Sequence, residues 1–339
     1  MSGSPESREG RGTRHPGLVG VGPAAERISA VVCTRDRPAL LERCLSALAC
    51  LSPAPMEVLV VDQSDGEDSA RAVEKFVGRI RGLRRLPTLS RGLSRARNEG
   101  IRAARGEMVA FTDDDCEVRP DWIGQVARAF LENPWVAAVT GGALPDPRLL
   151  SSGINPRILA AVTWHPEERR VFRGKVDPSL AGGGLNLSLR KSWVERVGMF
   201  DPDLGPGALH RGADDTDFLY RLLCSGGAIL YDPEVVVSHF PWREEKAQSA
   251  VEFEYGHGIS AWALKWAGKG DFFPAWIALK VLVSQGRRAL GGSLRGDRAA
   301  ARTGRAYLAG LGRGATARLF GKGGEGPPAG SVPGVQPRA

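Results

Sequence analysis

Three short apolar runs, each followed by a polar loop and then a helical pattern, constrain the fold of this chain most strongly. They span residues 28–33, 58–61 and 108–112. Runs of this length and composition are typical of strands that are buried on both faces of a parallel sheet. The alternation with helices predicts an α/β fold with a mostly parallel, Rossmann-like sheet flanked by helices.

The same periodicities predict the later elements. Helices are expected at residues 69–80 and 214–224, and strands at residues 185–189, 228–231 and 235–237. Beyond residue 244 the pattern is helical and partly amphipathic. The longest apolar stretch, residues 272–284, is interrupted by Pro274 and Lys280 and is too short to span a membrane.

The net charge of +8 is concentrated at the C-terminal end. From Lys280 onward there are eleven Lys and Arg but only two Asp and Glu, so the rest of the chain is close to neutral. A neutral fold with a basic tail argues against a nucleic acid partner. An anionic membrane surface is the first candidate for the tail, and a basic tail without a partner is an equal alternative.

The first 26 residues lack the apolar core of a signal peptide, and the five cysteines form no CxxC pair. These features indicate free thiols in a reducing compartment. The protein is therefore expected to be cytoplasmic, with peripheral attachment to the inner face of the cell membrane as an option.

The acidic run Asp113, Asp114 and Asp115 directly follows the third strand. Adjacent carboxylates repel one another unless a cation neutralises them, and such oxygen ligands suit Mg²⁺ or Mn²⁺ bridging to phosphate. A solvated acidic turn is the ordinary alternative. An EF-hand is excluded, because the sixth and twelfth positions are Val118 and Gly124 instead of Gly and Glu.

Other polar residues follow neighbouring strands, at Asp36, Asp62 and His239. Ligands of open α/β sheets bind outside the carboxyl ends of the strands. A lone His is more often structural, but an imidazole beside a metal is a suitable ligand. The acidic group at residues 214–217 opens a helix, so N-capping explains at least one carboxylate and another is free to act as a general base.

Six segments between Ile28 and His239, taken in order, resemble the family 2 glycosyltransferases, which have the GT-A fold. The segments are residues 28–37, 58–64, 93–101, 111–115 with 120–122, 183–186 with 197–201, and 214–217. The resemblance implies an inverting, metal-dependent hexosyltransferase with a DxD motif, of the kind used in cell-envelope polysaccharide biosynthesis. It would move a sugar from a nucleoside-diphosphate sugar to a hydroxyl of a saccharide, lipid-linked or cell-wall acceptor.

The resemblance also implies which residues bind the donor, a UDP- or dTDP-sugar. Asp62 would accept hydrogen bonds from the uracil or thymine base. Thr34 and Arg35 would line the nucleoside pocket, and Arg97 would lie near the base or the phosphates. Asp113 and Asp114 complete the implied donor-binding set.

The resemblance places Mg²⁺ or Mn²⁺ on Asp115, with Asp113 and His239 as further ligands. Asp215 would be the general base. Asp214 is held in reserve for that role, because Asp stands there where the family usually has Glu. Asn186 and Asp217 would lie on the acceptor side.

These expectations divide the chain into four parts. Residues 1–26 are predicted to be a disordered leader, and residues 321–339 a disordered tail. Residues 27–243 would be the catalytic domain, with a nucleotide-sugar half (27–140) and an acceptor half (141–243). Residues 244–320 would be a helical, basic extension.

Two alternatives belong to other functional classes. A nucleotidyltransferase on a similar sheet is expected to have a Gly-rich phosphate loop after the first strand, and residues 34–38 contain no Gly. A non-catalytic protein that binds sugar nucleotides or membranes is the other alternative, and the intact acidic groups argue against it.

Overall fold

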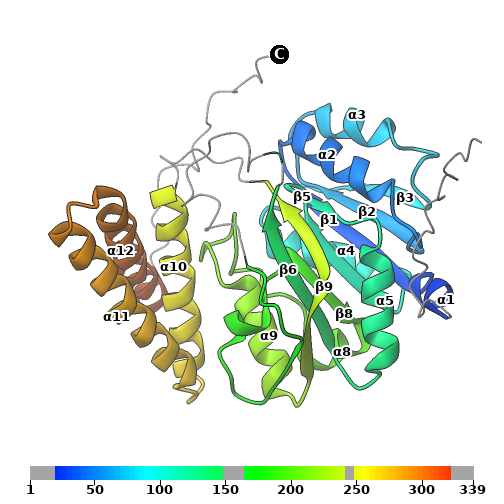
Figure 1. Cartoon of the computed structure of the whole chain (residues 1–339). Coiled ribbons are helices and arrows are strands. Elements are labelled where there is room, and N and C mark those ends of the chain that lie inside the picture. Colours follow the sequence, from blue (N-terminus) through cyan, green and yellow to red (C-terminus); the bar gives the residue numbers. More distant parts are fainter. Residues whose placement is uncertain (1–19, 147, 149–163, 241–247, 322–339) are drawn as a thin grey trace, which may run out of the picture.

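A computed structural model describes residues 20–146, 148, 164–240 and 248–321 of the chain. A mixed sheet of nine strands forms the centre, with helices on both faces and three long helices at one side (Figure 1). The strand order is β3-β2-β1-β4-β8-β6-β9-β5, and β7 pairs with β9 off this path. Strands β5, β7 and β8 run antiparallel to the other six, so the predicted mostly parallel sheet is confirmed.

The N-terminal half of the sheet is entirely parallel. Its strands are β1 (Ile28–Thr34), β2 (Glu57–Asp62), β3 (Leu83–Pro87) and β4 (Met108–Asp113). In the register of the sheet, Thr34 lies beside Asp62 and Cys33 lies beside Asp113. The polar residues after these strands therefore meet at one edge, as parallel strands require.

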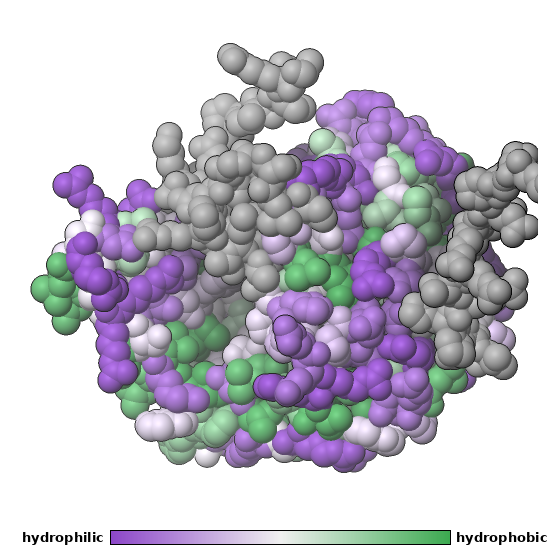
Figure 2. All heavy atoms as spheres, in the orientation of Figure 1, coloured by the Kyte–Doolittle hydropathy of each residue, from purple (hydrophilic) through white to green (hydrophobic). Residues whose placement is uncertain are grey.

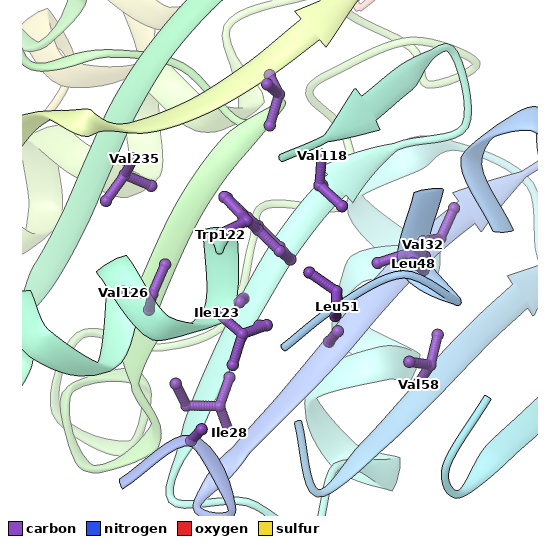
Figure 3. Close-up of a cluster of buried hydrophobic side chains, with 14 of the residues drawn as sticks. Ile28, Val32, Leu48, Leu51, Val58, Val118, Trp122, Ile123, Val126 and Val235 are labelled. Carbon is purple, nitrogen blue, oxygen red and sulfur yellow. The ribbon is translucent and has the colours of Figure 1, made fainter. Parts of the chain in front are cut away.

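Apolar side chains of the strands pack against helices on both faces. The helices of this half are α1 (Val21–Ala25), α2 (Pro38–Leu48), α3 (Asp68–Glu74), α4 (Leu93–Ala103) and α5 (Trp122–Glu132). Figure 3 shows one cluster, which includes Ile28, Val32 and Val58 of the sheet and Trp122 and Ile123 of α5.

Two boundaries in this half differ from prediction. The predicted disordered leader extended to residue 26, but residues 21–25 form α1, whose Val21 and Ala25 are buried in the core. Residues 1–19 lie outside the described part. The helix predicted at residues 69–80 ends at Glu74, and residues 75–79 form turns. The apolar side chains that suggested a longer helix, Phe76 and Ile80, are nevertheless buried.

The C-terminal half of the sheet is mixed. It contains β5 (Cys116–Val118), β6 (Ala138–Pro145), β7 (Arg170–Arg173), β8 (Asn186–Arg190) and β9 (Ala228–His239). Two separate strands, residues 228–231 and 235–237, were predicted, but β9 is continuous through both. Its register with β6 shifts between Gly141 and Gly142, and this β-bulge accommodates the irregular backbone around Pro233. A 3₁₀ turn (Pro178–Ala181), α8 (Lys191–Val197) and α9 (Asp214–Cys224) complete this half.

Three long helices follow the sheet: α10 (Gln248–Ala267), α11 (Phe273–Leu294) and α12 (Arg298–Phe320). Helices α10 and α11 pack on α9 through a cluster that includes Tyr220, Trp262 and Ile277, and α12 packs on α10 and α11. Pro274 was predicted to interrupt its segment, but it lies in the first turn of α11, where a missing N–H costs no hydrogen bond. No helix in the described residues is both long enough and apolar enough to cross a membrane.

Candidate active site

Of the three adjacent carboxylates, Asp113 ends β4, and Asp114 and Asp115 form the turn before β5. Asp113 Oδ1 lies 3.3 Å from Arg97 Nη2. Thr34 Oγ1 donates a 2.7 Å hydrogen bond to Asp114 Oδ2. Asp115 Oδ1 lies 3.6 Å from His239 Nε2. The predicted convergence of this run with Thr34, Arg97 and His239 is thus found in the structure.

Burial and repulsion from neighbouring carboxylates disfavour the charged forms of Asp113 and Asp114. Asp114 is 1% exposed, and burial raises its pKa to about 7, although an ion pair with Arg37 at 3.0 Å opposes the rise. Burial also raises the pKa of Asp113. Arg37, which the sequence reasoning did not select, reaches both Asp114 and Asp115. Its position in the loop after β1 was the only feature of the sequence that indicated a place in the site.

Asp115, Cys116 and His239 form a group that could hold a metal ion. The antiparallel pairing of β5 with β9 sets Cys116 opposite His239, so their side chains lie on the same face of the sheet. One ligand atom from each of the three lies within 4.8 Å of the others. Burial raises the pKa of the Cys116 thiol well above its usual value, which leaves the carboxylate and the imidazole as the better ligands. Asp113, predicted as a further ligand, faces Arg97 and is not part of this group.

Arg97 of α4 joins the first acidic run to the second. Its guanidinium lies 2.6 Å from Asp214 Oδ2 as well as 3.3 Å from Asp113 Oδ1, and its side chain is 3% exposed. Burial by itself would lower the pKa of Arg97, but the two carboxylates more than offset it and the pKa is raised. A Cβ at Gly184 would lie 2.5 Å from Arg97 Nη2, which explains why this position is a glycine.

The second acidic group begins α9, after Ala213 has turned the chain with a φ of 64°. Asp214 is buried against Arg97, and burial raises its pKa to about 6. Asp215 is only half-buried. Its Oδ2 accepts a 2.8 Å hydrogen bond from the Gly184 N–H, and its Oδ1 accepts one of 2.7 Å from the Thr216 N–H. Of the two candidates for the base, Asp215 is the more accessible.

Asp62, at the end of β2, and Arg35, just after β1, lie farther along the same sheet edge, away from the second acidic group. Asp62 is buried; Arg85 of β3 donates to its Oδ2 at 2.8 Å, and the Ser64 N–H donates to its Oδ1 at 2.9 Å. Arg35 is exposed and lies 3.3 Å from Asp36 and 3.9 Å from Asp65. The sequence did not predict Arg85 as a site residue, because β3 has no apolar run that would identify it as a strand.

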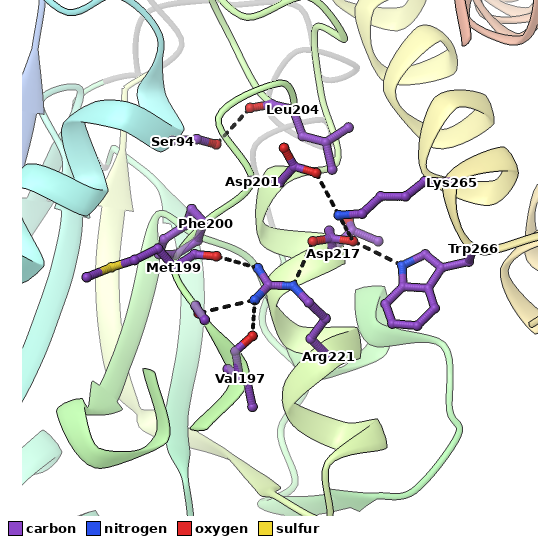
Figure 4. A network of polar contacts seen from close by, with 12 residues as sticks. Ser94, Val197, Met199, Phe200, Asp201, Leu204, Asp217, Arg221, Lys265 and Trp266 are labelled. Atoms are coloured by element: carbon purple, nitrogen blue, oxygen red, sulfur yellow. Dashed lines mark hydrogen bonds and ion pairs between the residues drawn. The ribbon is translucent and has the colours of Figure 1, made fainter. Parts of the chain in front are cut away.

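Two residues predicted on the acceptor side have structural environments instead. Asn186 is 1% exposed; its amide donates to the carbonyls of Gly142 and Val235 and accepts from Trp122 Nε1, at 2.9–3.0 Å. Asp217 is fully buried, and it accepts hydrogen bonds from Arg221, Lys265 and Trp266 (Figure 4). Both side chains stabilise the fold through buried partners, and their place on the acceptor side stays a prediction.

Comparison with known proteins decides the family. Residues 29–176 match the family model described as Glycosyl transferase family 2. The succinoglycan biosynthesis protein ExoM of Rhizobium meliloti is 30% identical over 286 residues, which are 76% of this chain and 85% of that protein. The chain belongs to glycosyltransferase family 2. It is therefore a glycosyltransferase, and the resemblance seen in the sequence is confirmed.

Further relatives of this glycosyltransferase agree with the family and the fold. The glucosyl-dolichyl phosphate glucuronosyltransferase of Haloferax volcanii is 24% identical and covers 65% of this chain and 71% of its own length. The solved structure of the mannosyltransferase PcManGT from Pyrobaculum calidifontis, in complex with GDP-Man and Mn²⁺, has a TM-score of 0.58 at 20% identity. It covers 87% of this chain and 88% of its own. The predicted GT-A type of fold is confirmed.

Proposed function

We propose that this glycosyltransferase moves a sugar from a nucleoside-diphosphate sugar to a hydroxyl group of a saccharide or lipid-linked acceptor, with inversion at the anomeric carbon. The observation that carries the proposal is the meeting of two acidic groups at one sheet edge, joined by the buried Arg97. One group lies beside an imidazole and suits a metal and a diphosphate. The other opens α9 and offers a carboxylate for the acceptor.

Asp115 and His239 would hold a divalent cation, Mg²⁺ or Mn²⁺. Their ligand atoms lie 3.6 Å apart, and a carboxylate with an imidazole is a donor set that suits Mn²⁺. The Mn²⁺ in the PcManGT structure supports this choice. A bound cation supplies neutralisation of the charge that develops on the departing diphosphate. Asp113 and Asp114 would position that group through Arg97, Thr34 and Arg37.

Asp62, Thr34 and Arg35 would accommodate the nucleoside of the donor, with Arg85 orienting the Asp62 carboxylate. Asp62 lies at the end of β2 on the same sheet edge, and each carboxylate oxygen can accept a second hydrogen bond. We favour a UDP- or dTDP-sugar because the family resemblance assigns Asp62 to the ring N–H of uracil or thymine, although the N–H groups of guanine would also suit this carboxylate. GDP-Man in PcManGT makes a guanosine donor the competing candidate.

Asp215 would act as general base. The Gly184 and Thr216 amides hold its carboxylate in position, whereas Asp214 is occupied by Arg97. Removal of the acceptor proton by Asp215 would allow the hydroxyl oxygen to attack opposite the diphosphate, which inverts the configuration. The division at residue 140 between a donor half and an acceptor half follows from this arrangement as part of the proposal.

A lipid-linked or cell-envelope acceptor would place the enzyme at the cytoplasmic face of the membrane. The names of the two relatives support this choice, since one belongs to succinoglycan biosynthesis and the other to dolichyl phosphate chemistry. The basic charge of the C-terminal helices gives independent support.

The proposal is tested by thermal shift with UDP-, dTDP- and GDP-sugars in the presence of Mn²⁺, followed by measurement of nucleotide release. A metal-dependent rise in melting temperature with one donor, and release of its nucleoside diphosphate, are expected. Release of pyrophosphate from a nucleoside triphosphate and a sugar phosphate would instead identify a nucleotidyltransferase. Binding of a donor without any turnover or slow hydrolysis would identify a non-catalytic protein.

A further inference from the structure

Helix α11 has two apolar faces, and one of them has no partner among the residues that the structure describes. Its packed face is buried against α9, α10 and α12. Its other face consists of large apolar side chains that are between 45% and 79% exposed, and we call this set the α11 stripe. The stripe comprises Phe272, at the N-cap, and Trp276, Leu279, Val283, Leu290 and Leu294.

The spacing of the stripe places its members on one side of the helix. Intervals of four, three, four, seven and four residues keep to the helical repeat. On the packed side, Ile277 belongs to the cluster with Tyr220 and Trp262, and Gly292 faces the backbone of Ala301. At about 100° per residue, Leu279 points roughly 200° away from Ile277. Figure 2 shows hydrophobic side chains among hydrophilic ones at the left of the molecule, where Figure 1 draws α11.

The charge around the α11 stripe is almost entirely positive. Residues 272–320 contain nine Lys and Arg and a single acidic residue, Asp297. Lys280, Arg287 and Arg295 are exposed and lie along one flank of the stripe at helical spacing. An apolar stripe with a Trp and a basic flank has the composition of a helix that lies in the headgroup region of an anionic bilayer.

We infer that the α11 stripe docks this glycosyltransferase on an anionic lipid bilayer, with α11 lying along the surface. Lipid tails would cover the apolar residues, and anionic headgroups would neutralise Lys280, Arg287 and Arg295. A second copy of the chain fits this surface less well, because two basic flanks would repel each other. The inference deepens the proposed location at the membrane but needs neither donor nor acceptor.

The docking surface is mechanically connected to the candidate active site. Lys265 of α10 donates hydrogen bonds to Asp201 at 2.7 Å and to Asp217 of α9 at 2.8 Å. Gly258 of α10 lies against the backbone of Gly212, two residues before Asp214. Docking through α11 would therefore hold the N-terminus of α9, with Asp214 and Asp215, at a set orientation to the bilayer.

Flotation of the full chain tests the inference, with vesicles of phosphatidylglycerol and phosphatidylcholine compared with phosphatidylcholine alone. Wild type should float with the anionic vesicles at low salt and less with the neutral ones. The double substitution Leu279→Glu/Leu290→Glu should lower the partition coefficient roughly tenfold or more, since burial of the exposed half of each Leu contributes roughly a factor of three to ten. Leu131→Glu on α5 is the matched control, because Leu131 and Leu279 are each 47% exposed.

Replacement of Lys280, Arg287 and Arg295 by Gln should remove the preference for anionic vesicles. Circular dichroism and donor-induced thermal shift, measured on each variant, separate loss of docking from loss of folding or of donor binding. Wild type that stays unbound at low salt would overturn the inference, as would an equal loss in Leu131→Glu. A wild-type dimer that Leu279→Glu/Leu290→Glu dissociates, without vesicle binding, would assign the α11 stripe to a second copy instead.

Discussion

At the scale of single residues, three adjacent carboxylates with the same chemistry have different environments. Asp113 faces a buried guanidinium, and Asp114 is enclosed by Thr34 and Arg37. Asp115 alone combines partial exposure with a neighbouring imidazole. The same substitution is therefore expected to have different effects at the three positions.

Asp115→Asn should abolish the metal-dependent part of donor binding. An amide oxygen lacks the charge that binds a divalent cation, so Mn²⁺ should no longer increase the thermal shift caused by the donor. Transfer activity should fall by at least two orders of magnitude, as when charge stabilisation is lost from a transition state. Asp121→Asn, in an exposed ion pair with Arg119, is the control and should behave as wild type. An unchanged Mn²⁺ effect in Asp115→Asn would rule out this residue as a ligand.

Asp215→Asn should retain donor binding and lose transfer by about 10²–10⁴-fold, which is the usual contribution of a general base. Asp214→Asn should differ, because it leaves the buried guanidinium of Arg97 without one of its two carboxylates and so changes the free energy of unfolding as well as activity. Single-turnover transfer and urea unfolding of both variants distinguish the two roles. If Asp214→Asn loses transfer at wild-type stability while Asp215→Asn keeps it, the base is Asp214.

At the scale of elements, α9 connects the site to the C-terminal helices. Its first turn carries Asp214 and Asp215, and Asp217 in the same turn accepts hydrogen bonds from Lys265 and Trp266 of α10. Buried polar groups of this kind are costly to leave without a partner. The helix that carries the proposed base is thus stabilised from the side opposite the sheet.

Lys265→Met should lower the free energy of unfolding by about 1–3 kcal/mol, because Asp201 and Asp217 each lose a donor while staying partly or fully buried. Chemical denaturation measures the change. Lys280→Met, on the exposed face of α11, should change stability by less than about 0.5 kcal/mol. Equal effects of the two substitutions would show that the buried ion pairs contribute nothing specific.

The elements differ in how well their sequences predict them. Strands β1, β2 and β4 were predictable because burial on both faces requires a continuous apolar run. Strands β3, β5 and β7 were missed: β3 and β7 have partly exposed, Arg-containing segments, and β5 is three residues long. Their pairing depends on neighbours that are distant in sequence. The predicted limits of the four-part domain division otherwise stay a prediction.

At the scale of the whole molecule, carboxylates from both halves of the sheet are brought into a buried setting around Arg97. Burial raises the pKa of Asp214 to about 6, against an ordinary value of 3.8. Between these two values the folded protein holds more protons than the unfolded chain. The contribution of Asp214 to stability therefore falls as the pH rises through this window and is constant above it.

The free energy of unfolding of wild type, relative to Asp214→Asn, should accordingly decrease between about pH 4 and pH 6 and level off above. Urea unfolding at a series of pH values, with EDTA present, measures this difference. Subtracting the free energy of unfolding of the variant from that of wild type removes the contribution of groups whose titration does not depend on Asp214. A difference that rises with pH would mean that the attraction of Arg97 outweighs burial.

The sequence by itself determined the central strands, the acidic turn after β4 and the family, because each depends on residues that are adjacent or regularly spaced. Only the tertiary structure decided what each polar side chain meets. Asp115 pairs with His239 across β5 and β9, and Arg97 pairs with Asp214 across 117 residues of chain. Asn186 and Asp217 are taken up by buried partners, and α11 keeps a second apolar face exposed. Burial and pairing depend on long-range packing, which no local pattern encodes.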